Sequence, residues 1–357
     1  MDAKRTTTFE PDYAVAPGET LREVMESLGM SQADLARRTE LTNMTVGRIL
    51  RGEQPITYGT ANRLELATGV PARLWNNLEM QYQEQKSKVE ELARLEADLE
   101  WLKSIPTKEL AERGEIPNQS EGPEQLRAAL AFYGVSSVQA WHEIWDRPKV
   151  AARRSACFDS RPGPASAWLR IGERKAQEVA CEPYDRSRFQ KALLAIRGLT
   201  REGPAVFEPR AKELCAAAGV ALVLVKEMAK VPWNGATEWL SPTKEMILLS
   251  LRGKGEDKFW FSFFHEAGHV LLHGKKDLFI NDDSVDSLEE REANEFAGKT
   301  LFPGTARERI AKARSATVLR QIADDIGVSP GIVAGQFQFL NKKWNYHKNL
   351  IRKLNLA

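Results

Sequence analysis

Apolar residues recur at helical spacing through the first 80 residues and divide this region into short helices. In "ETLREVMESLG" an apolar residue stands every three or four positions, and Gly29 follows the last turn. "SQADLARRTE" opens on Ser31 and carries Asp34 three residues later, the spacing of a capping box. "TNMTVGRILRGE" is a third short amphipathic segment. The pattern predicts a compact all-α domain over residues 1–83.

The pattern in the middle of the chain predicts further helices, and no motif there indicates a catalytic or binding site. From Gln83 to about Leu110 the sequence is charged and rich in Leu, with no Gly or Pro before Pro106, as in an amphipathic helix. Residues 111–200 have a helical pattern with breaks at 117–123 and 161–164, and they hold no chemical motif. We therefore expect residues 84–200 to form a helical connector.

Strand patterns begin after residue 203. "GVALVLVKEM" (219–228) is a continuous apolar run typical of a buried strand, and "GATEWL" and "EMILLSLRG" flank the turn "SPTK". A helix from about Asp257 to Gly274, a polar loop "KKDLFINDDSVDS" and a second helix "LEEREANEFAGKTLF", ended by Pro303, come next, and more helix closes the chain. Residues 201–357 are therefore predicted to be an α+β domain, so the fold class is multidomain.

Composition narrows the class of protein. Of 357 residues, 42% are hydrophobic and 28% charged, as in an ordinary globular protein. The longest apolar runs, "FWFSFF" and "ALVLV", are too short to span a bilayer, and the N-terminal segment lacks the apolar core of a secretion signal. Cys157, Cys181 and Cys215 are odd in number and widely spaced, which favours buried thiols in a reducing cytosol. We expect a cytoplasmic protein with no membrane segment.

The predicted helix from Asp257 carries the strongest candidate chemistry. It holds three of the five histidines of the chain inside an otherwise apolar pattern, and "HEAGH" has the form H-E-x-x-H. Positions four apart share one face of a helix, so His265 and His269 can direct imidazole nitrogens at one Zn²⁺. Glu266 then stands where a general base would activate water. The alternative is a buried helix whose His–Glu–His network is satisfied by hydrogen bonds alone.

Zinc also needs a third protein ligand, and the second helix offers one. In "EEREAN", Glu290 and Asn294 are four apart, so a carboxylate can reach the metal while the amide orients a ligand. His273 lies eight residues, or about 12 Å along a helix, from His265, too far to share the same ion. We expect His273 to interact at the helix C-terminus instead. Gly268 would allow the second helix to approach closely.

Two segments together resemble a known family. "FHEAGHVLLHG" followed about twenty residues later by "EREANEFAGKTLFP" is similar to the ImmA/IrrE metallopeptidases, over roughly residues 203–305. The resemblance implies a gluzincin-like zinc peptidase with one Zn²⁺ per chain. Glu290 matches the third-ligand position, and Glu292 is the fallback. The implied substrate is a repressor, an antitoxin or a toxin partner.

The reaction implied is metal-assisted amide hydrolysis, with Glu266 as the proton acceptor. A peptide substrate could be held by strand addition to "EMILLSLRG" or "GATEWL". The oxyanion-stabilising group is not identified by the pattern, although Arg252, Tyr346 and His347 have suitable chemistry.

The N-terminal domain has the layout of a helix-turn-helix, in "SQADLARRTELTNMTVGRILRGE". The second helix would present to a major groove four residues: Asn43, Met44, Thr45 and Arg48. Ser31 and Gln32 would lie near phosphate. The first 75 residues hold nine basic and ten acidic residues, whereas affinity for phosphate comes largely from positive charge. A small helical bundle that binds a protein is therefore the alternative.

Residues 16–83 resemble XRE-type helix-turn-helix regulators, specifically the HigA antitoxin branch, through "MSQADLA", "ILRGEQPIT" and "WNNLEMQY". The resemblance implies operator DNA as a partner and a homodimer. Two departures stand out: the turn "TEL" lacks the common Gly, and the extension beyond residue 85 has no place in a minimal antitoxin. The segment from "GATEWL" to "LLHGKK" is also similar to HigA-type regulators fused to an ImmA/IrrE domain.

Three hypotheses follow. The first is a DNA-binding regulator or antitoxin-like protein with an active zinc endopeptidase domain. The second is a non-catalytic antitoxin or repressor whose metallopeptidase fold serves as a structural or sensing module. The third is a peptidase whose helix-turn-helix binds a protein partner. Glu266 separates the first two hypotheses, because only catalysis needs it.

Overall fold

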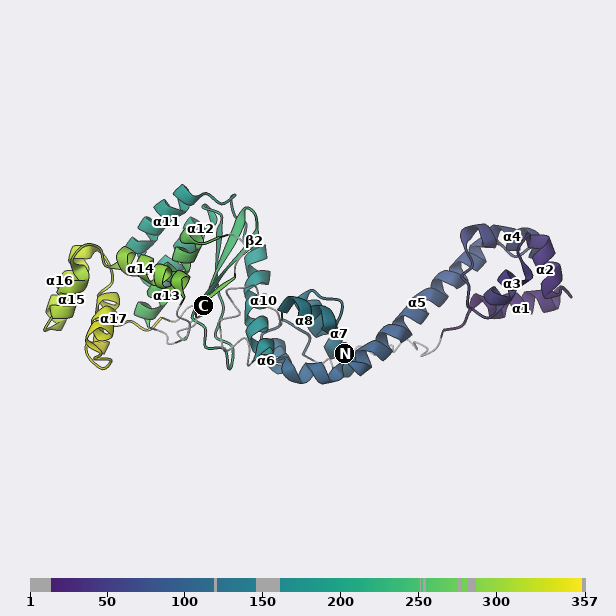
Figure 1. The fold of residues 1–357 in the computed structure, drawn as a ribbon, viewed down its shortest axis with the longest axis horizontal. Coiled ribbons are helices and arrows are strands. Elements are labelled where there is room, and N and C mark those ends of the chain that lie inside the picture. The colour runs from purple at the N-terminus through teal and green to yellow at the C-terminus, as the bar shows by residue number, and fades with distance from the viewer. Residues whose placement is uncertain are drawn as a thin grey trace, which may run out of the picture. The chain divides into compact units, whose positions relative to one another are not determined.

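The structure, a computed structural model, describes residues 14–118, 121–145, 161–250, 252, 255–274, 278–281 and 287–354. The chain divides into two compact units, Met1–Leu99 and Glu100–Ala357, drawn in Figure 1. Residues 84–200 contribute to both units, and the boundaries of the connector at 84 and 200 stay a prediction. The predicted fold class is confirmed: the first unit is all-α, and the second combines helices with a small mixed sheet.

The first unit is a set of helices around one apolar core. The helices are α1 (Pro17–Ser27), α2 (Gln32–Thr39), α3 (Asn43–Leu50), α4 (Tyr58–Thr68) and α5 (Ala72–Ala97). Each helix contributes buried residues to the core, which include Leu21, Leu35, Ile49, Leu64 and Trp75. The predicted short helices are thereby confirmed.

Local capping fixes the turn between α2 and α3. Ser31 and Asp34 form the predicted capping box at the start of α2. Thr42 caps α3 by accepting a hydrogen bond from the Thr45 N–H, at 3.0 Å. Glu40 ends α2 in the left-handed conformation, with φ of 55°. The turn therefore keeps the backbone conformation that Gly favours, with a Glu in its place.

The long helix differs from the prediction at both ends. The sequence suggested a helix from Gln83 to about Leu110, but α5 begins at Ala72 and ends at Ala97, and the 3₁₀ helix η1 (Leu99–Ser104) follows it. No Gly or Pro stands between Pro71 and Pro106, so nothing ends the helix near residue 83.

The second unit begins with helices and continues into a four-stranded sheet. Its helices before the sheet are α6 (Thr107–Glu112), α7 (Gly122–Tyr133), α8 (Val138–Trp145), α10 (Pro162–Glu178), α11 (Arg186–Leu199) and α12 (Pro204–Ala216). The strands are β1 (Val220–Leu224), β2 (Gly235–Ser241), β3 (Lys244–Leu249) and β4 (Phe279–Asn281), in the order β1-β3-β2-β4. β1 is parallel to β3, and the other two pairs are antiparallel.

Two elements of this sheet region differ from the sequence prediction. β4 lies inside the stretch predicted to be a polar loop, where Phe279 and Ile280 are buried. Three residues are too few to show a strand period. The expected strand addition of a substrate is wrong for β3, which is paired on both sides, and Gly235–Thr237 of β2 is also paired on both sides.

Helices cover both faces of the sheet, as Figure 1 shows. Along β3, side chains alternate: Ile247 and Leu249 belong to the core formed with α11 to α14, whereas Leu248 meets α10 at Gly172. α13 (Glu256–Leu272) lies on the first of these faces, and α14 (Leu288–Leu301) packs against it. The predicted helices of this region are confirmed.

Three more helices complete the second unit: α15 (Ala306–Lys312), α16 (Ala316–Ile326) and α17 (Pro330–Asn341), with the 3₁₀ helix η3 (Lys348–Leu350) after them. Arg352 then ties the end of the chain to the start of α13. The fully buried Glu256 carboxylate accepts hydrogen bonds from Arg352 Nε at 2.7 Å and from its backbone N–H at 3.0 Å. The same guanidinium also donates to the Thr200 carbonyl, at 2.6 Å.

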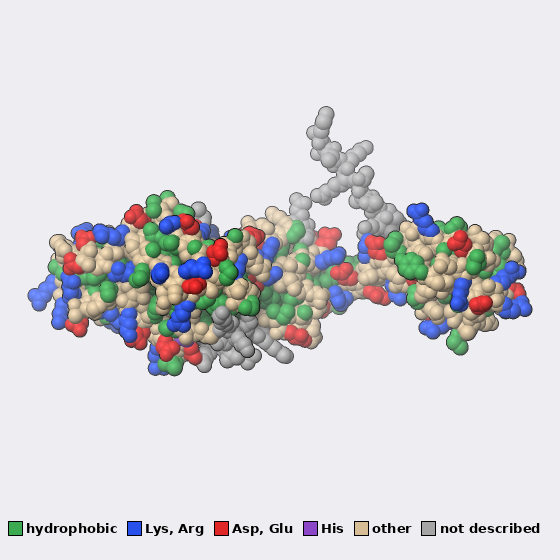
Figure 2. Space-filling view, turned by 90° about the horizontal axis from the view of Figure 1, so that it is seen from above, with side chains coloured by type: hydrophobic (Ala, Val, Ile, Leu, Met, Phe, Trp, Pro, Cys, Tyr) green, Lys and Arg blue, Asp and Glu red, His purple; other side chains and the backbone are tan. Residues whose placement is uncertain are grey.

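The apolar helices and the cysteines bear on two predictions made from the composition of the chain. Among the described residues no helix is long and apolar enough to cross a membrane. Cys215 is buried and Cys181 is half-buried, while Cys157 lies outside the described residues. Burial raises the pKa of the Cys215 thiol, as expected of an unreactive buried cysteine. Figure 2 shows acidic and basic side chains interspersed on the surface.

The Glu256–Arg352 pair generates a stability prediction. Replacing Arg352 with Met leaves a buried carboxylate without its cation, and we expect a loss of about 2–4 kcal/mol in the free energy of unfolding, because breaking a buried ion pair strands a charge. Urea unfolding followed by tryptophan fluorescence measures it. The control is Arg210→Met, whose ion pair with Glu213 is exposed and should cost about 0.5 kcal/mol or less. Equal losses in the two variants would contradict the proposed importance of the buried pair.

Candidate metal centre

The helix α13 is built to present polar groups from within an apolar core. Glu256 and Asp257 occupy its first turn, where negative charge complements the helix dipole. Its aromatic residues, which include Phe259, Trp260, Phe263 and Phe264, belong to the main core of the second unit. This packing anchors the helix, so the histidines on its remaining edge are held in fixed positions.

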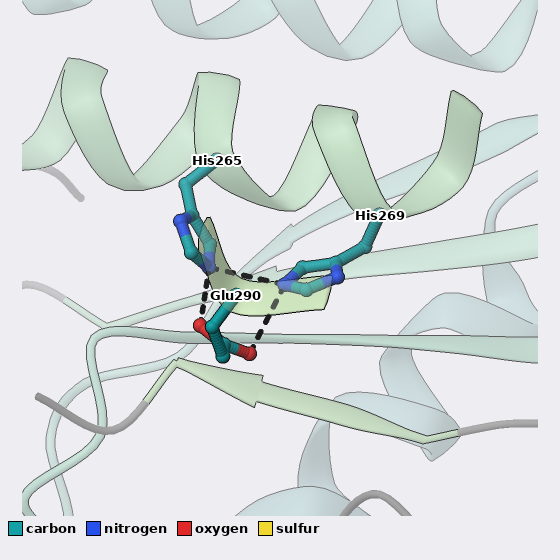
Figure 3. Close-up of side chains that lie close together, drawn as sticks. All are labelled: His265, His269 and Glu290. Carbon is teal, nitrogen blue, oxygen red and sulfur yellow. Dashed lines mark hydrogen bonds and ion pairs between the residues drawn. The ribbon is translucent and has the colours of Figure 1, made fainter. Parts of the chain in front are cut away.

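His265, His269 and Glu290 converge on one point, as Figure 3 shows. The Nε2 atoms of the two histidines are 3.0 Å apart, and they lie 3.0 Å and 3.3 Å from the two carboxylate oxygens of Glu290. All three side chains are buried, and their ligand atoms lie within 4.8 Å of one another. Two imidazoles and one carboxylate are the protein ligands of many catalytic zinc sites, so these residues fit the ion.

A second set of side chains orients the two histidines. His265 Nδ1 lies 3.1 Å from Asn294 Oδ1, the contact expected of an amide that orients a ligand. His269 Nδ1 lies 2.9 Å from His273 Nδ1, and its ring stacks on Phe279 at 4.4 Å. In both histidines Nδ1 is therefore engaged, and Nε2 faces the site.

His273 and Glu292 lie outside the group of three. The His273 Nε2 atom is 3.0 Å from Glu292 Oε2, and Glu292 is largely exposed. His273 ends α13 as its C-cap residue. The structure thus places Glu290, and not the fallback Glu292, beside the two histidines.

Glu266 is fully buried and faces the sheet. Its Oε2 atom accepts a hydrogen bond of 2.6 Å from the Thr237 hydroxyl on β2. A Cβ atom at Gly235 would lie only 2.5 Å from Glu266 Oε1, so Gly235 makes room for the carboxylate. Sequence reasoning missed Thr237 and Gly235, because neither belongs to a motif around the helix.

Burial and mutual contacts set the charges of the three residues. Burial lowers the pKa of His269 to about 4. Burial would raise the pKa of Glu290, but hydrogen bonds with His265 and His269 hold it at about 2. Burial also opposes the charged form of His265, yet its hydrogen bond to Glu290 and the charge of Glu266 raise its pKa above the usual value. At neutral pH Glu290 is ionised and His269 is neutral, the forms that bind a metal.

The three candidates for oxyanion stabilisation lie in different places. Tyr346 and His347 lie beside α17, with the His347 ring 5.1 Å from that of Phe337. Arg252 lines an open cavity together with Ser262 of α13.

The candidate DNA-contacting residues lie on α2 and α3. Met44 is 75% exposed, and Asn43 and Arg48 are exposed as well. Thr45 is half-buried, and its hydroxyl lies 2.9 Å from that of Thr42. Gln32 Nε2 donates to the Asn43 carbonyl at 2.8 Å and so joins the two helices. The Ser31 hydroxyl is engaged with Asp34 in the cap of α2.

Comparison with known proteins finds a matching family for each of the two units. Residues 21–75 match the helix-turn-helix family model, and residues 223–337 match that of the IrrE N-terminal-like domain, a peptidase family. The chain is 30% identical to the uncharacterized HTH-type transcriptional regulator YddM of Escherichia coli (strain K12) over 63 residues, which are 18% of this chain and 67% of that protein. The chain therefore belongs to the helix-turn-helix family of DNA-binding transcriptional regulators, and its second unit carries an IrrE N-terminal-like metallopeptidase domain.

Proposed function

We propose that this regulator is a zinc-dependent endopeptidase that cleaves a repressor or a toxin–antitoxin partner. The observation that carries the proposal is the position of Glu266. It is a buried carboxylate, held by Thr237 and next in the chain to His265, one of three side chains that could hold a metal ion. His265, His269 and Glu290 are the proposed ligands of one Zn²⁺ per chain, and Asn294 orients His265.

The chemistry proposed is hydrolysis of a peptide bond. A zinc ion bound there would lower the pKa of water and polarise the scissile carbonyl. Glu266 accepts the proton of the attacking water and passes it to the leaving amine. Thr237 donates to one oxygen of Glu266 and so fixes the direction of the carboxylate. The Gly235 backbone leaves space for that carboxylate to take its position.

The alternative function is a non-catalytic antitoxin or repressor whose peptidase fold is a structural or sensing module. Such a module would need the three ligands, which both functions share. It would have no use for Glu266, whose burial costs free energy unless a partner or a function compensates. The single hydrogen bond from Thr237 offsets only part of that cost, so the presence of a fully buried carboxylate at this position favours the catalytic proposal.

The first unit is proposed to bind operator DNA through α3. Asn43, Met44 and Arg48 are exposed and can reach base edges, and an apolar Met suits a thymine methyl group. Thr45 takes part from the same helix. Ser31 and Gln32 are proposed to lie near phosphate, with Gln32 also joining α2 to α3.

A homodimer in the cytoplasm is the proposed form of the protein. Two recognition helices would match half-sites about 34 Å apart. Binding to a protein partner through α2 and α3 stays the alternative for this unit.

The ligand set predicts a selective loss of zinc. Wild-type protein is expected to purify with one zinc ion per chain, and Glu290→Gln should weaken zinc binding by at least about 100-fold, since it removes an ionised ligand. Glu292→Gln tests the fallback ligand and should have a smaller effect. Elemental analysis and competition with a chelator measure the affinities. Glu295→Gln is the matched control, because Glu295 is exposed on the same helix and pairs with Lys299.

Zinc binding should also depend on pH in a defined direction. The raised pKa of His265 means that its proton competes with the metal. As the pH falls below that pKa, the affinity should decrease by about tenfold per unit, and above that pKa the dependence should flatten. Chelator competition between pH 5.5 and 8.5 measures this. An affinity that does not change with pH would argue against His265 as a ligand.

Catalysis predicts a separation between metal binding and cleavage. Glu266→Gln should keep zinc but lower cleavage by about 100-fold or more, because the general base is lost. Co-expression of the wild type and the variant with proteins from neighbouring genes, followed by mass spectrometry of their sizes and amounts, measures cleavage. Thr237→Val should show a smaller loss. If wild type and Glu266→Gln leave identical partner proteins, the catalytic proposal fails and the non-catalytic function is favoured.

A further inference from the structure

An open cavity lies on the second unit, next to the N-terminal half of α13. The described polar residues that line it are Asn234, Ser250, Arg252, Lys258 and Ser262. They come from three parts of the chain: the residue before β2, the segment after β3, and α13.

The cavity is adjacent to the candidate catalytic carboxylate. Ser262 stands three residues before His265 and four before Glu266, so it lies on the same face of α13, one turn toward the helix N-terminus. Asn234 directly precedes Gly235, the residue packed against Glu266. One turn of helix rises about 5.4 Å, which is the length of one or two residues of extended peptide.

Positive charge in the cavity is not neutralised by an ion pair. Among the described residues neither Arg252 nor Lys258 forms a salt bridge. Of the two acidic residues that begin α13, Glu256 is bound by Arg352. Asp257 lies between Gly335 of α17 and Gly255, which lines the cavity, and it forms no ion pair with either cation among the described residues.

Two neutral groups add hydrogen-bonding capacity. Ser262 is only 8% exposed, and within the described part of the chain its hydroxyl has no hydrogen bond to another group. The Asn234 amide likewise makes no side-chain hydrogen bond to a described residue. Ser250 differs, because its hydroxyl donates to the Trp233 carbonyl at 2.8 Å. The Ser262 hydroxyl and the Asn234 amide can both donate hydrogen bonds, so the cavity is suited to a ligand that accepts them.

We propose that this cavity binds a carboxylate of the peptide substrate, supplied by an Asp or Glu side chain one to three residues from the cleaved bond. The inference rests on the proposed peptidase function and adds its substrate class. Lys258 and Arg252 supply the charge, and Ser262 and Asn234 supply hydrogen-bond donors. Charge-assisted hydrogen bonds of this kind are roughly twice as strong as neutral ones.

A binding experiment tests the cavity without catalysis. The protein is the full chain with the Glu266→Gln substitution. Three probes are titrated into it, and their binding is followed by NMR. The probes are N-acetyl-glutamate amide, N-acetyl-glutamine amide and N-acetyl-glutamine with a free carboxyl end. The glutamate amide should bind about tenfold more tightly than the glutamine amide. If only the free carboxyl end improves binding, the cavity takes a chain terminus and the proposal of an acidic side chain is wrong. Equal binding of all three probes would also overturn it.

Variants of the residues that line the cavity test where the glutamate probe binds. Lys258→Met and Ser262→Ala should each remove most of the preference for the glutamate probe. Lys299→Met is the matched control, since Lys299 is an exposed lysine on α14 paired with Glu295, and it should bind as the parent does. A loss of preference in the control equal to that in Lys258→Met would show a general charge effect and would contradict the proposal.

Cleavage profiling separates this inference from the proposed function. Zinc-loaded wild type is incubated with a peptide mixture from a digested proteome, and the cleavage sites are read by mass spectrometry. Acidic residues should be enriched at one fixed position, and Lys258→Met should lose the enrichment while it still cleaves peptides with Gln at that position. Cleavage without any acidic preference would overturn the inference and leave the peptidase proposal intact. No cleavage at all would contradict the peptidase proposal, while the binding result would still decide the cavity.

Discussion

The close packing of α14 against α13 is the constraint on which the candidate metal centre depends. Where the two helices meet, a Cβ atom on Gly268 would lie 3.1 Å from the Ala293 Cα atom, and Ala293 itself is fully buried. Small residues on both sides allow the helices to approach, as the sequence suggested for Gly268. This approach carries Glu290, three residues before Ala293, to within 3.0 Å of His265. Gly therefore stands within the H-E-x-x-H segment in spite of its cost to helix stability.

Charge inside this core is tolerated because the two histidines and Glu266 each have a defined partner. His265 meets Asn294, His269 meets His273, and Glu266 meets Thr237. A buried charge without such partners costs several kcal/mol. The partners come from α13, α14 and β2, so the site requires the sheet as well as the two helices. The ion pair between Glu256 and Arg352 holds the N-terminal end of α13 in place.

Much of this arrangement could be predicted from the sequence, because local spacing determines it. The periodicity of α13 and α14 and the four-residue spacing of His265 and His269 are local signals, and Glu290 followed from the spacing on the second helix. The contact between Thr237 and Glu266 and the pairing of β4 with β2 could not be predicted, since both join residues far apart in the sequence and leave no periodic signal. The start of α5 at Ala72 was missed because adjacent helical segments without Gly or Pro merge into one helix.

Exposure distinguishes the unit that recognises DNA from a helix pair of similar local design. α16 and α17 are also short helices joined by a tight turn, with Gly327 in the left-handed conformation and Ser329 as the cap of α17. However, α17 buries most of its residues against α13 and its neighbours, whereas α3 keeps Asn43, Met44 and Arg48 exposed. A helix enters a major groove only if its side chains are free to reach base edges. The capping and turn residues are therefore similar in both helix pairs, but α17 is buried in the core of the second unit, whereas α3 keeps exposed the side chains proposed to contact DNA.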